Sequence, residues 1–190
     1  MLVVLPVIVT YVAVLIANFF PRAPTWQIRG QKYTSVSFNY DFTMAAEMEL
    51  ELELYNDNLL SAHVNAIELE VLHRDAWGVE RPFARIHVAG DFALPARGSV
   101  RRAGTMVMDA LAPAMAGALA RDAAANGGTL VTRAHSTMDV SVLGGAARAR
   151  LEAECVQHLR ADAFPMEVTY IDCRYYMGRH RVPMLPTPVR

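Results

Sequence analysis

Residues 47–54 alternate carboxylates with apolar side chains, and this stretch constrains the fold more than any other. Side chains of a strand point to opposite faces with a period of two, so the pattern predicts a strand with one dry face and one wet face. Burying each large apolar side chain is worth roughly 1.5–3 kcal/mol, whereas neighbouring carboxylates in water repel by well under about 1 kcal/mol. A slip of one residue would bury four carboxylates, so the register is sharply defined. The apolar members are Met48, Leu50, Leu52 and Leu54, and the acidic members are Glu47, Glu49, Glu51 and Glu53.

The same reasoning predicts a mainly β domain with short connections. Gly, Pro, Asn and Asp mark the turns between the apolar runs, as at Asn56-Asp57-Asn58. The apolar parity changes near Asn65, which indicates a β-bulge. The predicted strands cover residues 34–43, 47–54, 60–73, 85–88, 92–94, 100–108, 130–143, 146–159 and 168–175.

Residues 146–159 have a helical composition but the face pattern of a strand. Arg and Glu at 148, 150, 152 and 154 alternate with apolar residues at 149, 151, 153 and 155. We predict a strand, because tertiary context overrides propensity more readily than it overrides a face pattern.

One segment predicts a helix. Asp109 can cap it, Leu111, Met115 and Leu119 recur every four residues, and residues 126–128 (Asn-Gly-Gly) end it. The expected domain is therefore mainly β with one short helix.

Residues 2–20 carry no charge and predict an N-terminal transmembrane helix in preference to a cleaved signal peptide, because no basic residue precedes them and residues 17–20 (Ala-Asn-Phe-Phe) make a poor cleavage site. At about 1.5 Å per residue they reach across a hydrocarbon core of about 30 Å. We expect a membrane helix over 1–20, a linker over 21–33, the β domain over 34–178 and a Pro-rich tail over 179–190. Arg22 and Trp26 are candidate membrane-interface residues. The basic residues that follow the helix favour a cytosolic domain by the positive-inside rule.

Charge and cysteine content exclude some classes of protein and leave others open. The net charge of −1 gives no reason to expect nucleic acid. Cys155 and Cys173 are too few for a disulfide scaffold or a Cys-rich zinc site. Each lies in a predicted strand, so they either form one disulfide or stay as two buried thiols.

No motif in the sequence predicts catalysis, a metal site or a cofactor. The six histidines lack ligand spacing on any one element. His135, Ser136 and Asp139 crowd one strand, whose neighbouring side chains point to opposite faces, so they cannot form a triad. Carboxylates along one flat strand cannot surround Ca²⁺. The acidic face formed by Glu47, Glu49, Glu51 and Glu53 is therefore a solvated face or a docking surface for a basic partner.

The chain resembles the type 2 late embryogenesis abundant domain, also called the water stress and hypersensitive response domain, which includes the plant NDR/HIN-like membrane proteins. Residues 50–58 (Leu-Glu-Leu-Glu-Leu-Tyr-Asn-Asp-Asn) resemble the family strand that leads into Asn-Pro-Asn, with Asp57 in place of Pro. Residues 67–71, 92–96 and 106–108 resemble later family strands. The resemblance implies an antiparallel β-sandwich of the immunoglobulin or fibronectin type with one short helix, and no enzyme activity. It also implies a lumenal or extracellular domain, so the side of the membrane stays open.

Two functions are compatible with these observations. The first is a non-enzymatic, single-pass membrane protein whose β domain is an interaction module. Such a protein would be an accessory subunit that contacts lipid and other membrane protein subunits, or a membrane protein of the stress or defence response. The second is binding or transfer of a lipid or other apolar ligand, suggested by 53% hydrophobic residues and ten methionines. An ordinary core also explains that content. A continuous apolar cavity larger than about 300 Å³ would favour the second function.

Overall fold

The computed structural model describes residues 22, 24–74, 78–142, 145, 147–160 and 167–183. These residues form ten strands and one helix. The strands are β1 (Thr25–Phe38), β2 (Met44–Asn56), β3 (Ala62–Arg74), β4 (Glu80–Val88), β5 (Phe92–Leu94), β6 (Gly98–Leu111), β7 (Thr129–Val142), β8 (Ala147–Arg160), β9 (Glu167–Met177) and β10 (His180–Val182), and the helix is α2 (Pro113–Ala125). The prediction of a mainly antiparallel β fold with one helix is confirmed.

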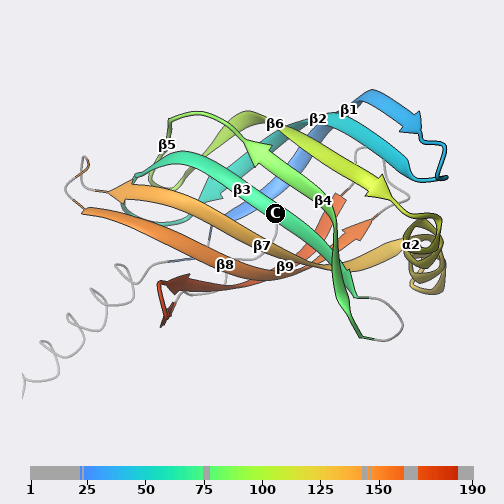
Figure 1. Ribbon diagram of the computed structural model, residues 1–190. Helices are drawn as coiled ribbons and strands as arrows, with labels where there is room; N and C mark the ends of the chain where they lie inside the picture. The colour runs from blue at the N-terminus through green and yellow to red at the C-terminus, as the bar shows by residue number, and fades with distance from the viewer. Residues whose placement is uncertain are drawn as a thin grey trace, which may run out of the picture.

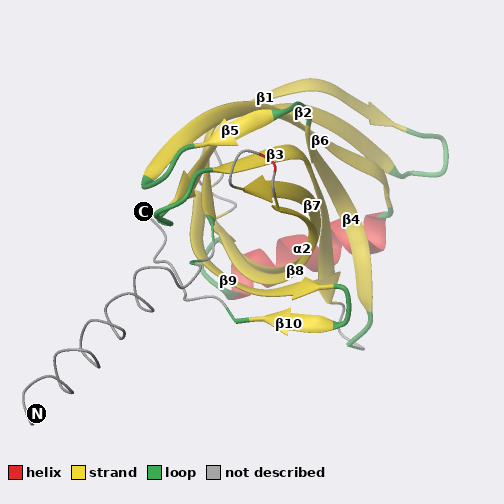
Figure 2. Cartoon of the chain, turned by 90° about the vertical axis from the view of Figure 1, so that its left-hand side faces the viewer, coloured by secondary structure: helices red, strands yellow, loops and turns green. Residues whose placement is uncertain are grey.

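All ten strands belong to one antiparallel sheet, in the order β1-β2-β6-β4-β3-β7-β8-β9-β10, with β5 paired to β3. The sheet curves strongly, so that the strands surround a common interior (Figures 1 and 2). Near its start β1 approaches β9, where the Tyr175 hydroxyl donates to the carbonyl oxygen of Pro24 at 3.5 Å. The predicted separation into two packed sheets is therefore not confirmed.

Strand β2 has the two faces that its sequence predicts. Met48, Leu50, Leu52 and Leu54 are buried, and they belong to the main apolar cluster of the protein. The predicted bulge in β3 is also present, as a shift in the β3–β7 register between Val64 and Ile67. Residues 147–160 form strand β8 despite their helical composition.

Helix α2 lies across one end of the curved sheet (Figure 2). Met115 and Leu119 pack against the core, and His73 Nε2 on β3 lies 3.1 Å from Asp122 Oδ2 on the helix. The predicted cap at Asp109 is wrong, because Asp109 belongs to β6 and the N-cap is Ala112. Pro113 takes the first turn, where its missing N–H has no intrahelical partner to lose.

The first strand was predicted in the wrong place. It begins at Thr25, inside the predicted linker over 21–33, and it ends at Phe38. The alternation over 34–43 misleads because Phe38, Tyr40 and Phe42 are exposed at the β1–β2 turn and do not enter the core. In the described part of the chain no helix is long and apolar enough to cross a membrane, and the predicted membrane helix over 2–20 lies outside it.

Candidate functional site

The interior of the curved sheet contains a cavity of about 580 Å³. Its walls come from β1, β2, β3, β4, β5, β7, β8 and β9, so strands from the whole length of the chain enclose one space. The volume falls within the range of about 300–1,000 Å³ that is typical of small-molecule sites.

The walls are apolar because they are the inner faces of alternating strands. β2 contributes Leu52 and Leu54, which lie on the dry face that the sequence predicts. Alternate positions of β8 supply small side chains at Ala149 and Ala153, where larger residues would fill the interior. The other apolar wall residues are Ala62, Val64, Ile67, Leu69, Ile86, Val88, Phe92, Leu94, Met138, Val140 and Leu151.

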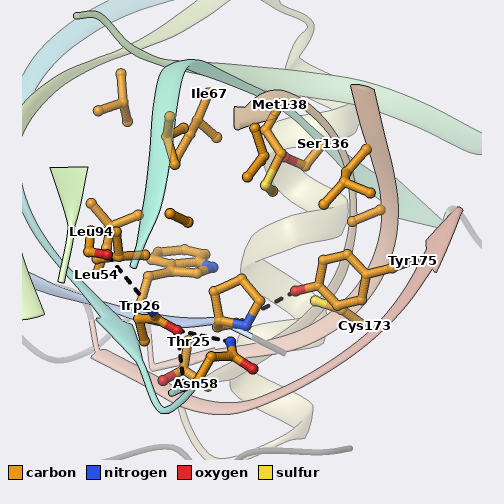
Figure 3. Close-up of a pocket in the computed structure, with 18 of the residues that line it drawn as sticks. Thr25, Trp26, Leu54, Asn58, Ile67, Leu94, Ser136, Met138, Cys173 and Tyr175 are labelled. Atoms are coloured by element: carbon orange, nitrogen blue, oxygen red, sulfur yellow. Dashed lines mark hydrogen bonds between the residues drawn. The ribbon is translucent and has the colours of Figure 1, made fainter. Parts of the chain in front are cut away.

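Two aromatic side chains that carry polar atoms, Trp26 of β1 and Tyr175 of β9, also line the cavity (Figure 3). Burial raises the pKa of the Tyr175 phenol well above its usual value, so its hydroxyl keeps its proton and remains a hydrogen-bond donor. Trp26 is half-buried against the core. The structure thus places one of the two predicted membrane-interface residues in the cavity wall.

Polar groups of the β2–β3 turn hold the chain beside the cavity. Asn58 Nδ2 donates to the carbonyl oxygen of Arg22 at 3.0 Å, and the Arg22 backbone N–H donates to Asn58 Oδ1 at 2.6 Å. Asn58 also donates to Asn56 Oδ1, whose own amide nitrogen bonds carbonyl oxygens of the β5 segment. These bonds tie Arg22, the second predicted interface residue, to the cavity entrance.

Four exposed side chains among the lining residues mark where the cavity opens to solvent: Arg22, Leu60, Arg148 and Met177. Two of them carry guanidinium groups, whereas the rest of the lining is uncharged and mostly apolar. Two buried hydroxyls in the lining, Thr25 Oγ1 and Ser136 Oγ, have no hydrogen-bond partner among the described residues. The site therefore combines an apolar interior with a cationic entrance.

Cys155 and Cys173, the possible pair in the sequence, form a disulfide in the structure. They lie directly opposite each other on β8 and β9 and line the cavity. The bridge fixes the register of these two strands and so the shape of one wall.

The acidic face of β2 divides into two halves. Glu53 accepts hydrogen bonds from Tyr55 and Arg29 at 2.6 Å each, and these, with a further bond from Ser99, hold its pKa at about 2. Glu51 lies 3.5 Å from Arg101 on β6. Glu47 and Glu49 are exposed and form no ion pair with a described residue. Only this half of the predicted docking surface has free carboxylates.

The described residues contain no group of three or more metal-binding side chains. His135 is exposed on the outer face of β7, whereas Ser136 is buried on the inner face, so the two do not converge. The sequence raised an apolar cavity as one alternative, but it did not identify the residues that line it. Ala149 and Ala153 on the inner face of β8 were the sequence feature that could have indicated the cavity, but small residues are equally compatible with a facing strand that packs more closely.

Comparisons with known proteins give little further information. No family model and no curated protein matches the chain. Among solved structures, the Northeast Structural Genomics Consortium target SoR45 aligns with 11% identity and a TM-score of 0.39, over 71% of this chain and 82% of that chain. A protein from Archaeoglobus fulgidus aligns with 8% identity and a TM-score of 0.32, over 79% and 96%. The sporulation control protein Spo0M from Bacillus subtilis aligns with 8% identity and a TM-score of 0.28, over 83% and 80%.

Proposed function

We propose that this protein binds a lipid or similar amphiphile in the interior of its curved sheet. The observation that carries the proposal is the cavity of about 580 Å³, whose walls are apolar over nearly all their area. This is the feature that separates an apolar-ligand protein from one whose hydrophobic content serves only a packed core.

The ligand's apolar part occupies the space between β3, β7 and β8, and its polar end lies at the entrance beside Arg22 and Arg148. Each methylene transferred from water contributes about 0.8 kcal/mol, so ten buried methylenes supply about 8 kcal/mol before the costs of association. Affinities from millimolar to micromolar are therefore within reach.

The protein acts on this ligand by binding and release, with no chemical step. The described cavity lining includes the hydroxyls of Thr25 and Ser136, but it contains no histidine, carboxylate or lysine that could act as a base toward them, and the described residues contain no metal-binding group. The predicted membrane helix over 2–20 would keep the cavity entrance near a bilayer, where a lipid can enter and leave. This role is also compatible with the resemblance to the type 2 late embryogenesis abundant family, which implies no enzyme activity.

The alternative role, an accessory subunit of a membrane protein complex, is supported by the free carboxylates of Glu47 and Glu49. Reversing both charges (Glu47→Lys with Glu49→Lys) would weaken such an assembly without unfolding the domain, because both side chains are exposed. Unchanged co-purification of partners would remove this role.

Native mass spectrometry of the full chain, purified in mild detergent, tests ligand binding. We expect a bound species with the mass of a single amphiphile, which organic extraction releases and which re-forms when a fatty acid is added. A protein that is ligand-free as isolated and takes up no fatty acid would contradict the proposal.

A further inference from the structure

The turn between β1 and β2 exposes three aromatic side chains together. Phe38, Tyr40 and Phe42 are 77%, 106% and 81% exposed, more than any other large apolar residue described. The turn projects beyond the curved sheet as the loop that follows β1 (Figure 2). We refer to Phe38, Tyr40 and Phe42 as the aromatic tip.

The polar residues of this turn bond to one another and leave the aromatic residues outside. The Asn39 N–H donates to the carbonyl oxygen of Thr43 at 2.9 Å, and its side-chain amide donates to Thr43 Oγ1 at 2.9 Å. Thr43 in turn donates from its hydroxyl and its N–H to Asp41 Oδ1, at 2.7 and 3.1 Å. These bonds among Asn39, Asp41 and Thr43 give the turn a defined conformation.

Phe42 adopts a left-handed backbone conformation with φ of 64°, which is unusual for a bulky side chain. No apolar contact within the described core compensates for it, because the ring is exposed. Residues with strained backbone conformations are concentrated at functional sites, including sites that bind a ligand.

We propose that the aromatic tip inserts into the interfacial region of a lipid bilayer. Aromatic side chains are enriched at the membrane–water interface, where an apolar ring can leave water while polar atoms stay hydrated. The turn suits that boundary, since its three rings are exposed while Asn39, Asp41 and Thr43 place polar atoms beside them that can stay hydrated. The tip lies at the far end of the 14-residue strand β1 from Thr25, so the tip and the predicted membrane helix over 2–20 meet the same bilayer when β1 runs along the membrane surface.

The size of the tip favours lipid over a protein partner. Three aromatic residues bury about 150–250 Å² each, so the tip offers roughly 600 Å², less than the roughly 800 Å² per partner of a stable protein interface. The rival occupant is a second copy of this chain along the edge of β1, which would also cover Tyr33 and Val36, both half-exposed.

Charges around the tip favour a neutral membrane surface. Lys32 faces Glu49 in the β1–β2 register, and Asp41 and Glu47 add negative charge. Because acidic residues outnumber basic ones here, insertion should depend on the rings, and anionic lipid should weaken it and not strengthen it.

An environment-sensitive fluorophore at the tip tests the proposal. The sequence has two cysteines and both form the disulfide, so Tyr40→Cys in the full chain provides a single labelling site. The control is Thr169→Cys, on an exposed position of β9. Both proteins are reconstituted in phosphatidylcholine vesicles, with and without phosphatidylglycerol, that carry a nitroxide-labelled lipid.

We expect the label at position 40 to shift to shorter emission wavelengths and to be quenched by the nitroxide lipid, whereas the label at position 169 stays water-like. In the double variant Phe38→Ser with Phe42→Ser, the ratio of membrane-inserted to water-exposed label should be at least about tenfold lower. Val79→Ser with Val131→Ser, which removes two exposed apolar residues elsewhere, should not.

A water-like label at position 40 in vesicles would overturn the proposal. So would a shifted label that the lipid does not quench and that depends on protein concentration, because that result identifies a second copy as the occupant.

Discussion

The variants Ala153→Phe and Ala134→Phe place the same ring at two inner positions of the sheet with different surroundings. Ala153 on β8 is 3% exposed and lines the cavity, whereas Ala134 on β7 is 0% exposed and does not line it. A phenyl ring at position 153 can enter the cavity, where burying it is worth about 1.5–3 kcal/mol. At position 134 the ring must displace packed atoms, which costs about 1–3 kcal/mol.

We therefore expect Ala153→Phe to leave the free energy of unfolding unchanged or raise it by up to about 3 kcal/mol, and Ala134→Phe to lower it by about 1–3 kcal/mol. Each kcal/mol corresponds to about 2–4 °C in the melting temperature of a chain of this size. The filled cavity should also bind a fluorescent fatty acid at least about tenfold more weakly.

The assay is thermal unfolding of the delipidated full chain together with a fatty-acid titration. Equal destabilisation by both variants, with fatty-acid binding unchanged in Ala153→Phe, would refute the reasoning, since it would mean that no accessible space lies beside Ala153.

Three further predictions concern the fold itself. Leu52→Asp buries an unpaired carboxylate and should lower the free energy of unfolding by about 4 kcal/mol or more. The control Glu51→Asp, on the wet face, should leave the midpoint of urea unfolding unchanged. A wild-type urea midpoint for Leu52→Asp would contradict the orientation of β2. The Glu53 pKa falls from 4.5 to about 2 in the fold, so Glu53 stabilises the protein above about pH 4.5 and that contribution is lost as the pH falls toward 2. Glu53→Gln should make the free energy of unfolding, measured with urea, depend less on pH in this range. An unchanged pH dependence would show that the contacts of Glu53 with Tyr55 and Arg29 do not cause it. Reducing the disulfide, whose cysteines are separated by 18 positions, should lower the free energy of unfolding by about 3 kcal/mol; Cys155→Ala with Cys173→Ala should be equally destabilised and insensitive to reductant.

The local pattern of the sequence predicts most of the strands. The alternation in β2 and β8 identifies their buried faces, even where Ala146 to Leu159 has a helical composition, because a face pattern reports burial directly. It fails for β1, since Phe38, Tyr40 and Phe42 alternate without entering the core. Periodicity records which residues are apolar and carries no information on whether their shared face meets other protein atoms.

The curvature and the cavity could not be predicted, because both depend on pairings between distant segments. β2 pairs with β6, and β3 pairs with β4, β5 and β7, so the interior is set by the order of strands in space. Whether Ala149 and Ala153 allow close packing or leave a cavity depends on how far away the facing strands lie. The Cys155–Cys173 pairing was compatible with the sequence, but it required the β8–β9 register to be defined.

Fluorescence of Trp26 provides the most direct test of ligand binding in the cavity. Trp26 lines the cavity, and Trp77 is the only other tryptophan, so a Trp77→Phe background isolates its signal. With a nitroxide-labelled fatty acid, we predict quenching that saturates at one ligand per chain and disappears in Ala153→Phe. Quenching that rises without saturation, or that persists unchanged in Ala153→Phe, would show that the fatty acid approaches Trp26 from the surrounding membrane or detergent and would contradict a ligand site inside the sheet.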